Sequence, residues 1–60
     1  MTKKDYKKFA DMMVELLRIH GRTDALDDVE HNLKLIFMID NERFNEAKWK
    51  EYIKERMALT

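Results

Sequence analysis

The stretch LKLIFMI at residues 33–39 contains one charged residue among seven and stands near the middle of a chain of 60 residues. In a helix on the surface of a small domain, apolar side chains form a stripe that covers only part of the circumference. In this stretch the apolar side chains would point almost all the way round. The sequence therefore raises the question of what covers the second face of this segment.

A short apolar run is also compatible with a buried strand. Here, however, an apolar stripe at helical spacing begins seven residues earlier and continues in phase: Leu26, Val29, Leu33, Ile36 and Phe37. A lone strand would also find no partner strand elsewhere in the chain. The pattern predicts a helix over residues 24–40, capped by Thr23 or Asp24, with Leu33, Ile36 and Phe37 facing the core.

Two further helices are expected, over residues 3–20 and 46–57. Thr2 and Asp5 form a capping pair for the first helix, and Gly21 stands where a glycine ends a helix. The stripe of the first helix is Tyr6, Phe9, Ala10, Met13, Leu16, Leu17 and His20. Asn45 can cap the third helix, whose apolar side carries Trp49, Tyr52, Ile53 and Met57, while Phe44 packs on Trp49 as a hydrophobic staple. The prediction is all-α: one compact three-helix domain over residues 1–60, which dimerisation would complete.

The composition excludes several kinds of site. There is no cysteine, so disulfides and thiolate zinc sites are ruled out. His20 and His31 are too few for a histidine-only metal site, and without serine a Ser-His-Asp arrangement is impossible. His20 is interpreted as a helix-end residue, and His31 as the partner of Asp27 four residues earlier. We expect no enzyme activity, no cofactor and no metal.

The formal net charge is zero, with 12 basic and 12 acidic residues, but the charges are unevenly distributed. Residues 1–22 hold six basic and three acidic side chains, whereas residues 23–46 hold two basic and seven acidic ones. Nucleic-acid-binding domains are usually basic overall, whereas alternating patches suit pairing with another protein or with a second copy. The run at 33–39 is too short for a membrane span. We expect a cytoplasmic protein without a membrane partner.

Apolar residues outside the predicted core are the strongest indication of a function. Leu35, Met38, Ile39, Met12, Val14 and Ile19 exceed what three short helices can bury among themselves, and exposed apolar patches mark association surfaces. Alternatively, the third helix covers Leu35 and Ile39. The predicted interface for a partner or for self-association is Leu35, Met38, Ile39, Met12 and Ile19. The predicted charged contact surface is Lys4, Lys7, Lys8, Asp24, Asp27 and Asp28.

A nucleic-acid-binding regulator is the alternative hypothesis. Lys4, Lys7 and Lys8 could contact phosphates, and the second and third helices could form a helix-turn-helix arrangement. Against it, the third helix presents mixed Lys and Glu rather than the Arg, Asn, Gln or Ser side chains that read base edges.

The two ends of the chain carry a resemblance. MTKKDY at residues 1–6 resembles the start of many very short proteins encoded by phages and integrated mobile elements. Their other end commonly reads Asp-Asn-Pro-Arg-Phe, then a polar turn and an aromatic residue; residues 40–44 and Trp49 are similar, with Glu42 in place of proline. The resemblance implies a protein of the host-cell cytoplasm that binds a host macromolecule, most concretely an inhibitor of host defence of the anti-CRISPR kind acting through protein–protein contacts.

Overall fold

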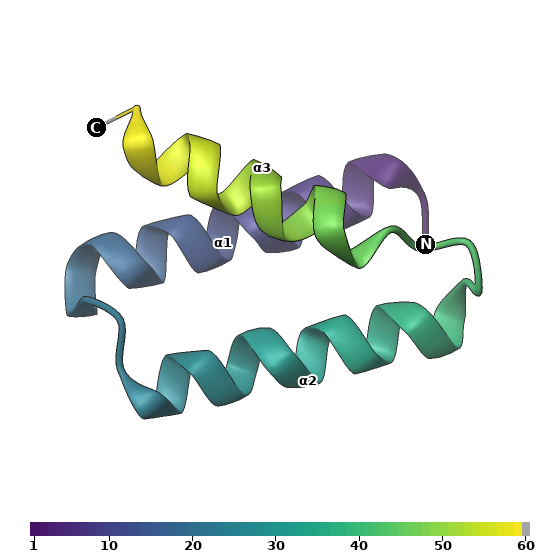
Figure 1. Cartoon of the computed structure of the whole chain (residues 1–60), viewed down its shortest axis with the longest axis horizontal. Helices are drawn as coiled ribbons and strands as arrows, with labels where there is room; N and C mark the ends of the chain where they lie inside the picture. The colour runs from purple at the N-terminus through teal and green to yellow at the C-terminus, as the bar shows by residue number, and fades with distance from the viewer. Residues whose placement is uncertain (60) are drawn as a thin grey trace.

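Three helices make up the computed structural model, which describes residues 1–59. They are α1 (Lys3–His20), α2 (Asp24–Asp40) and α3 (Glu46–Ala58). The predicted all-α, three-helix fold is confirmed, and the predicted bounds agree except that α3 is one residue longer. Figure 1 shows α3 lying across α1 while α2 runs alongside, with the N-terminus beside the α2–α3 connection.

Local sequence signals set the start of each helix. Thr2 accepts a hydrogen bond from the backbone N–H of Asp5, whose carboxylate accepts one from the N–H of Thr2, which completes a capping box. Thr23 and Asn45 cap α2 and α3 in the same way, through the N–H groups of Leu26 and Lys48 respectively. Each side chain satisfies a backbone donor that the helix leaves without a partner.

The end of α1 depends on Gly21, which has a φ of 75° and a ψ of 177°. The positive φ agrees with the sequence expectation, but the ψ lies far from the left-handed helical region. This combination is essentially restricted to glycine, because a β-carbon would be strained there. A glycine is therefore required for the chain to leave α1 and enter α2 within three residues.

The core lies mainly between α1 and α3. It consists of Tyr6, Ala10, Met13, Val14 and Leu17 from α1, Trp49 and Ile53 from α3, and Phe37 from α2. Ala10 is fully buried in this core. Val14, which the sequence analysis counted among the surplus apolar residues, is buried in this core, so that interpretation was wrong.

Phe37 connects α2 to the other helices through an aromatic cluster. Its ring centroid lies 4.9 Å from that of Tyr6, 5.3 Å from those of Phe44 and Trp49, and 5.4 Å from that of Phe9. The predicted staple is present as well, because the Phe44 and Trp49 centroids are 6.1 Å apart. Phe37 is the one apolar residue of the described α2 that is fully buried.

Replacing Phe37 by alanine is expected to lower the free energy of unfolding by about 3–5 kcal/mol, the usual cost of removing a buried aromatic side chain. The neighbouring Ile36→Ala substitution, at a half-exposed position, should cost less than about 1 kcal/mol. Urea unfolding followed by circular dichroism measures both variants. Equal losses would contradict the assignment of Phe37 as the contact that holds α2.

Candidate functional site

The apolar residues predicted to form an interface are all exposed. Ile39 and Ile19 are 86% and 65% exposed, and Met12, Leu35 and Met38 are each exposed by 40% or more. The structure adds Val29 and Ile36, which are also exposed. Ile36 was predicted to face the core, and this prediction was wrong, because half of its surface is accessible.

Two charged residues occupy the inner side of α2, and this explains the exposure of Ile36. Glu30 is buried next to the Arg22 guanidinium, with 3.1 Å between Nη1 and Oε2. The Lys34 side chain is only 14% exposed and lies 3.3 Å from Glu46 of α3. The helix therefore turns Glu30 and Lys34 inward together with Phe37, and its apolar stripe moves toward the solvent. The apolar periodicity of α2 did not reveal this rotation. The signal was the presence of ion-pair partners elsewhere in the chain, Arg22 for Glu30 and Glu46 for Lys34.

On α2, part of this apolar surface faces away from α3. Lys34 reaches α3, and Ile36, two positions later, points about 200° further round the helix. Val29 is seven residues before Ile36 and lies on the same face. Leu35 and Ile39 point outward, each about 200° from the buried Phe37. The third helix does not cover Leu35 and Ile39, so that alternative from the sequence analysis was wrong.

On α1, the corresponding side is apolar as well. Asp11 faces α3, because its Oδ1 accepts a hydrogen bond from the Tyr52 hydroxyl at 2.9 Å. Phe9, two residues earlier, lies on the opposite flank, and Met12 and Leu16 follow it at helical spacing. Ile19, seven residues after Met12, continues this line on the outer side of α1.

We name this side of the α1–α2 pair the apolar flank. It consists of Phe9, Met12, Leu16, Val29, Leu33 and Ile36. Three of these residues are exposed and three are half-buried. The predicted interface residues are thus not gathered at one point: Met12 and Ile19 lie on the α1 side, and Leu35, Met38 and Ile39 on the α2 side. Val29 and Ile36, which the sequence analysis missed as surface residues, lie between the two groups.

The predicted charged contact residues are exposed at the two ends of the molecule. Lys4, Lys7 and Lys8 lie on the first turns of α1, while Asp24, Asp27 and Asp28 lie on the first turns of the antiparallel α2. The acidic group is partly engaged within the chain, because Asp27 accepts a hydrogen bond from Arg22 at 2.7 Å. Asp27 therefore pairs with Arg22, and not with His31 as the sequence analysis expected.

Both histidines lie on the surface of the molecule. His20 and His31 are both exposed, so His20 does not complete the buried stripe of α1. His31 lines a cleft of about 720 Å³ between α2 and α3, together with Glu30, Lys50 and Lys54. Among residues 1–59 no group of three His, Cys, Asp or Glu side chains is placed to hold a metal ion.

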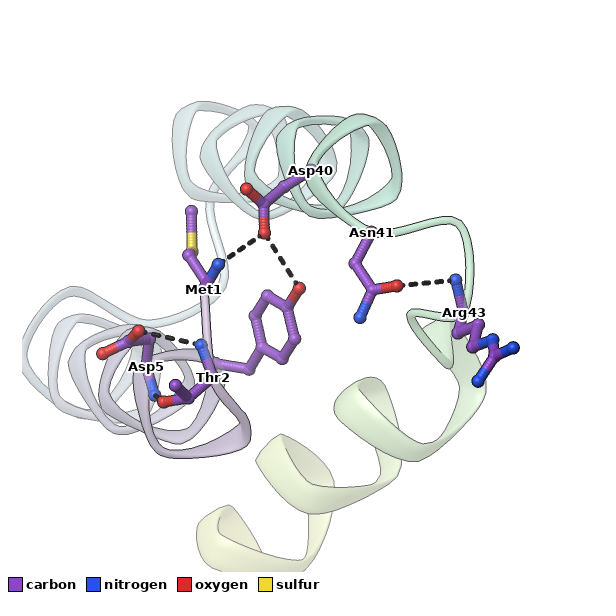
Figure 2. Close-up of polar contacts among 7 residues, drawn as sticks. Met1, Thr2, Asp5, Asp40, Asn41 and Arg43 are labelled. Carbon is purple, nitrogen blue, oxygen red and sulfur yellow. Dashed lines mark hydrogen bonds and ion pairs between the residues drawn. The ribbon is translucent and has the colours of Figure 1, made fainter.

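Asp40 ties the start of α1 to the end of α2. Its Oδ2 atom accepts a hydrogen bond from the amino group of Met1 at 2.8 Å and another from the Tyr6 hydroxyl at 3.2 Å. Figure 2 shows the carboxylate between the amino group and the tyrosine hydroxyl. The hydrogen bond from the Met1 ammonium lowers the pKa of Asp40, and the same bond raises the pKa of the ammonium. Burial and the contact with Asp40 raise the pKa of the Tyr6 hydroxyl. A carboxylate at the end of a helix is otherwise unfavourable, and the ammonium compensates for it.

Comparisons of this chain with protein-family models, with curated proteins and with solved structures found no match. The candidate surfaces are therefore assigned from their own geometry. In the part of the chain that the structure describes, no helix has both the length and the apolar character needed to cross a membrane.

The Asp40 contacts predict a pH dependence of stability with two limbs. Because the folded-state pKa of Asp40 is lowered, its contribution is present above its unfolded pKa of about 3.9 and is lost as the pH falls through the folded value. Because the pKa of the Met1 ammonium is raised, its contribution is present below about pH 8 and is lost as the pH rises through the folded value.

Thermal unfolding across this pH range should show the Asp40→Asn variant melting below the wild type near neutrality. The difference in melting temperature between the two proteins should decrease toward acidic pH and toward alkaline pH. The stability of the variant should still fall at acidic pH, because the pKa values of Asp5 and Glu46 are also lowered. The decrease between about pH 8 and 10, before tyrosine ionises, should disappear in Asp40→Asn. If that decrease persists unchanged, the ammonium–carboxylate contact is not the cause.

Proposed function

We propose that this protein acts by binding another protein through the apolar flank and the adjoining outer residues of α2. The observation that carries the proposal is the exposure of Ile36, Ile39, Leu35 and Met38 on the last two turns of one helix. In soluble proteins, a concentration of exposed apolar side chains of this kind usually marks an association surface.

The total surface of the chain supports the same conclusion. Its accessible area is 4641 Å², whereas the scaling for folded monomers gives about 4,200 Å² at this size. Fully burying an exposed aliphatic side chain contributes about 1.5–3 kcal/mol, which is large beside the net stability of a small domain. A partner on this side would therefore stabilise α2 as well as bind to it.

The composition of the flank favours a protein as the partner. Met12 and Met38 are flexible side chains that adapt to the shape of a bound surface. The exposed face of Val29, Ile36 and Ile39 offers no cation to a phosphate backbone. The resemblance of the chain ends to short phage and mobile-element proteins makes a host-defence protein the most concrete form of this partner, and self-association is a further form.

The double variant Ile36→Lys/Ile39→Lys tests the proposal. Both positions are exposed, so each substitution should change the free energy of unfolding by less than about 1 kcal/mol. Placing two charges within the interface should weaken binding by about 100-fold or more, which corresponds to about 2.7 kcal/mol. The matched control is Ala47→Lys/Ala58→Lys, which adds the same charge on exposed positions of α3.

Immobilised wild type, variant and control are compared for the proteins they retain from a lysate of the source cells, and sedimentation at high micromolar concentration measures self-association. We expect one partner, or a dimer, that forms with the wild type and the control and is lost with Ile36→Lys/Ile39→Lys. Retention that is equal in all three proteins, or a wild type that stays monomeric and retains nothing, would contradict the proposed function.

A further inference from the structure

A cleft of about 570 Å³ lies on the other side of α1, between its first turns and the start of α3. Its volume is in the range of small-molecule sites. Four basic residues from separate parts of the chain line it: Lys3 and Lys7 of α1, Arg43 of the α2–α3 connection, and Lys48 of α3. No carboxylate lines it. We name it the basic cleft.

The four cations of the basic cleft have no acidic partner, whereas four other cations of the described chain do. Arg22, Lys34, Lys50 and Arg56 each lie within 3.7 Å of a carboxylate oxygen. Within residues 1–59, Lys3, Lys7, Arg43 and Lys48 form no ion pair. The chain as a whole has as many acidic as basic residues, so the excess of positive charge at the cleft is confined to this part of the surface. An anion bound there would relieve the repulsion among the four cations.

The rest of the lining adds aromatic surface, one side-chain amide and the N-terminus of a helix. Tyr6, Phe44, Trp49 and Tyr52 line the wall, and Phe44 and Tyr52 are only partly buried. The side chains of Asn41 and Arg43 also line the cleft. Figure 2 shows the Arg43 side chain next to Asn41, pointing outward. The N-terminus of α3 lies at the same cleft through Asn45, and its partial positive charge favours anions.

We propose that the basic cleft binds a phosphate group carried by a nucleotide or by single-stranded nucleic acid. A phosphate presents several strong acceptor oxygens to the lysine ammonium groups, and a flat base attached to it can stack on a partly exposed ring. Of the lysines that the sequence analysis assigned to phosphates, only Lys7 lines the cleft. The site needs no helix-turn-helix arrangement, and it is separate from the apolar flank.

The experiment uses Trp49, which is the only tryptophan in the chain and lines the cleft. Its fluorescence is followed at low salt during titration with inorganic phosphate, thymidine monophosphate, a short oligothymidylate and, as an anion without phosphate, polyglutamate. The test variant is Lys7→Glu/Lys48→Glu. The matched control is Lys4→Glu/Lys54→Glu, which changes the net charge equally on the same two helices but outside the cleft.

We expect a saturable change in Trp49 emission with at least one of the phosphate probes, weakened at least tenfold in Lys7→Glu/Lys48→Glu and less than threefold in the control. Equal affinity for the monophosphate and the oligothymidylate identifies a nucleotide site, and a preference for the oligothymidylate identifies a strand site. For a strand that contacts about three cations, the affinity should fall with salt with a logarithmic slope near −2.

Three results would overturn the proposal: no binding of any phosphate probe by the wild type, equal binding of polyglutamate, or equal weakening by the control. Polyglutamate binding would instead indicate an acidic protein segment as the ligand. Circular dichroism verifies the fold of each variant. If Lys7→Glu/Lys48→Glu does not fold, Lys7→Gln/Lys48→Gln replaces it, and shifts of the backbone amide signals of Lys3, Lys7 and Lys48 in NMR spectra of the wild type locate the probe.

Discussion

The burial of Phe37 among the rings of Tyr6, Phe9, Phe44 and Trp49 is the contact on which the position of α2 depends. It is the one apolar side chain of that helix, within residues 24–40, that loses all of its accessible surface. Aromatic pairs at such centroid distances contribute beyond the area that they bury. A domain with so few residues has few other contacts that could hold α2 against α1 and α3. The ring of Phe37 therefore provides much of the packing of α2.

Polar contacts at the two ends of α2 complete this attachment and determine how the helix is rotated. The Arg22–Glu30 pair acts near its start, and the contact of Asp40 with Met1 acts at its end. Lys34 bridges to Glu46 in between. Isolated ion pairs on a protein surface contribute little to stability. Glu30 and Lys34 are mostly buried, however, and a rotation of α2 that buried Ile36 or Val29 would separate them from Arg22 and Glu46.

The helices could be predicted from the sequence because their signals are local. The Thr2–Asp5 box, the Thr23 and Asn45 caps and the Phe44–Trp49 staple involve residues within a few positions of one another. The rotation of α2 could not be predicted in this way. Where apolar residues surround a helix, periodicity gives no single direction, and the inward placement of Glu30 and Lys34 depends on partners from other segments. For the same reason the exposed residues Leu35, Met38 and Ile39 were identified, whereas Ile36 and Val29 were missed. The basic cleft, assembled from three separate segments, had no signature along the chain.

The packing of α3 against α1 affects how the molecule opens. Since α1 and α3 share most of the core, the loss of α2 would leave them still packed together, whereas the loss of α1 would remove five of the eight buried core residues. Backbone amides of α2 should therefore exchange with solvent through a partial opening that costs less free energy than global unfolding. The helix that carries Ile36 and Ile39 is thus also the most easily released one, and a partner covering these residues would slow its hydrogen exchange while leaving that of α1 nearly unchanged.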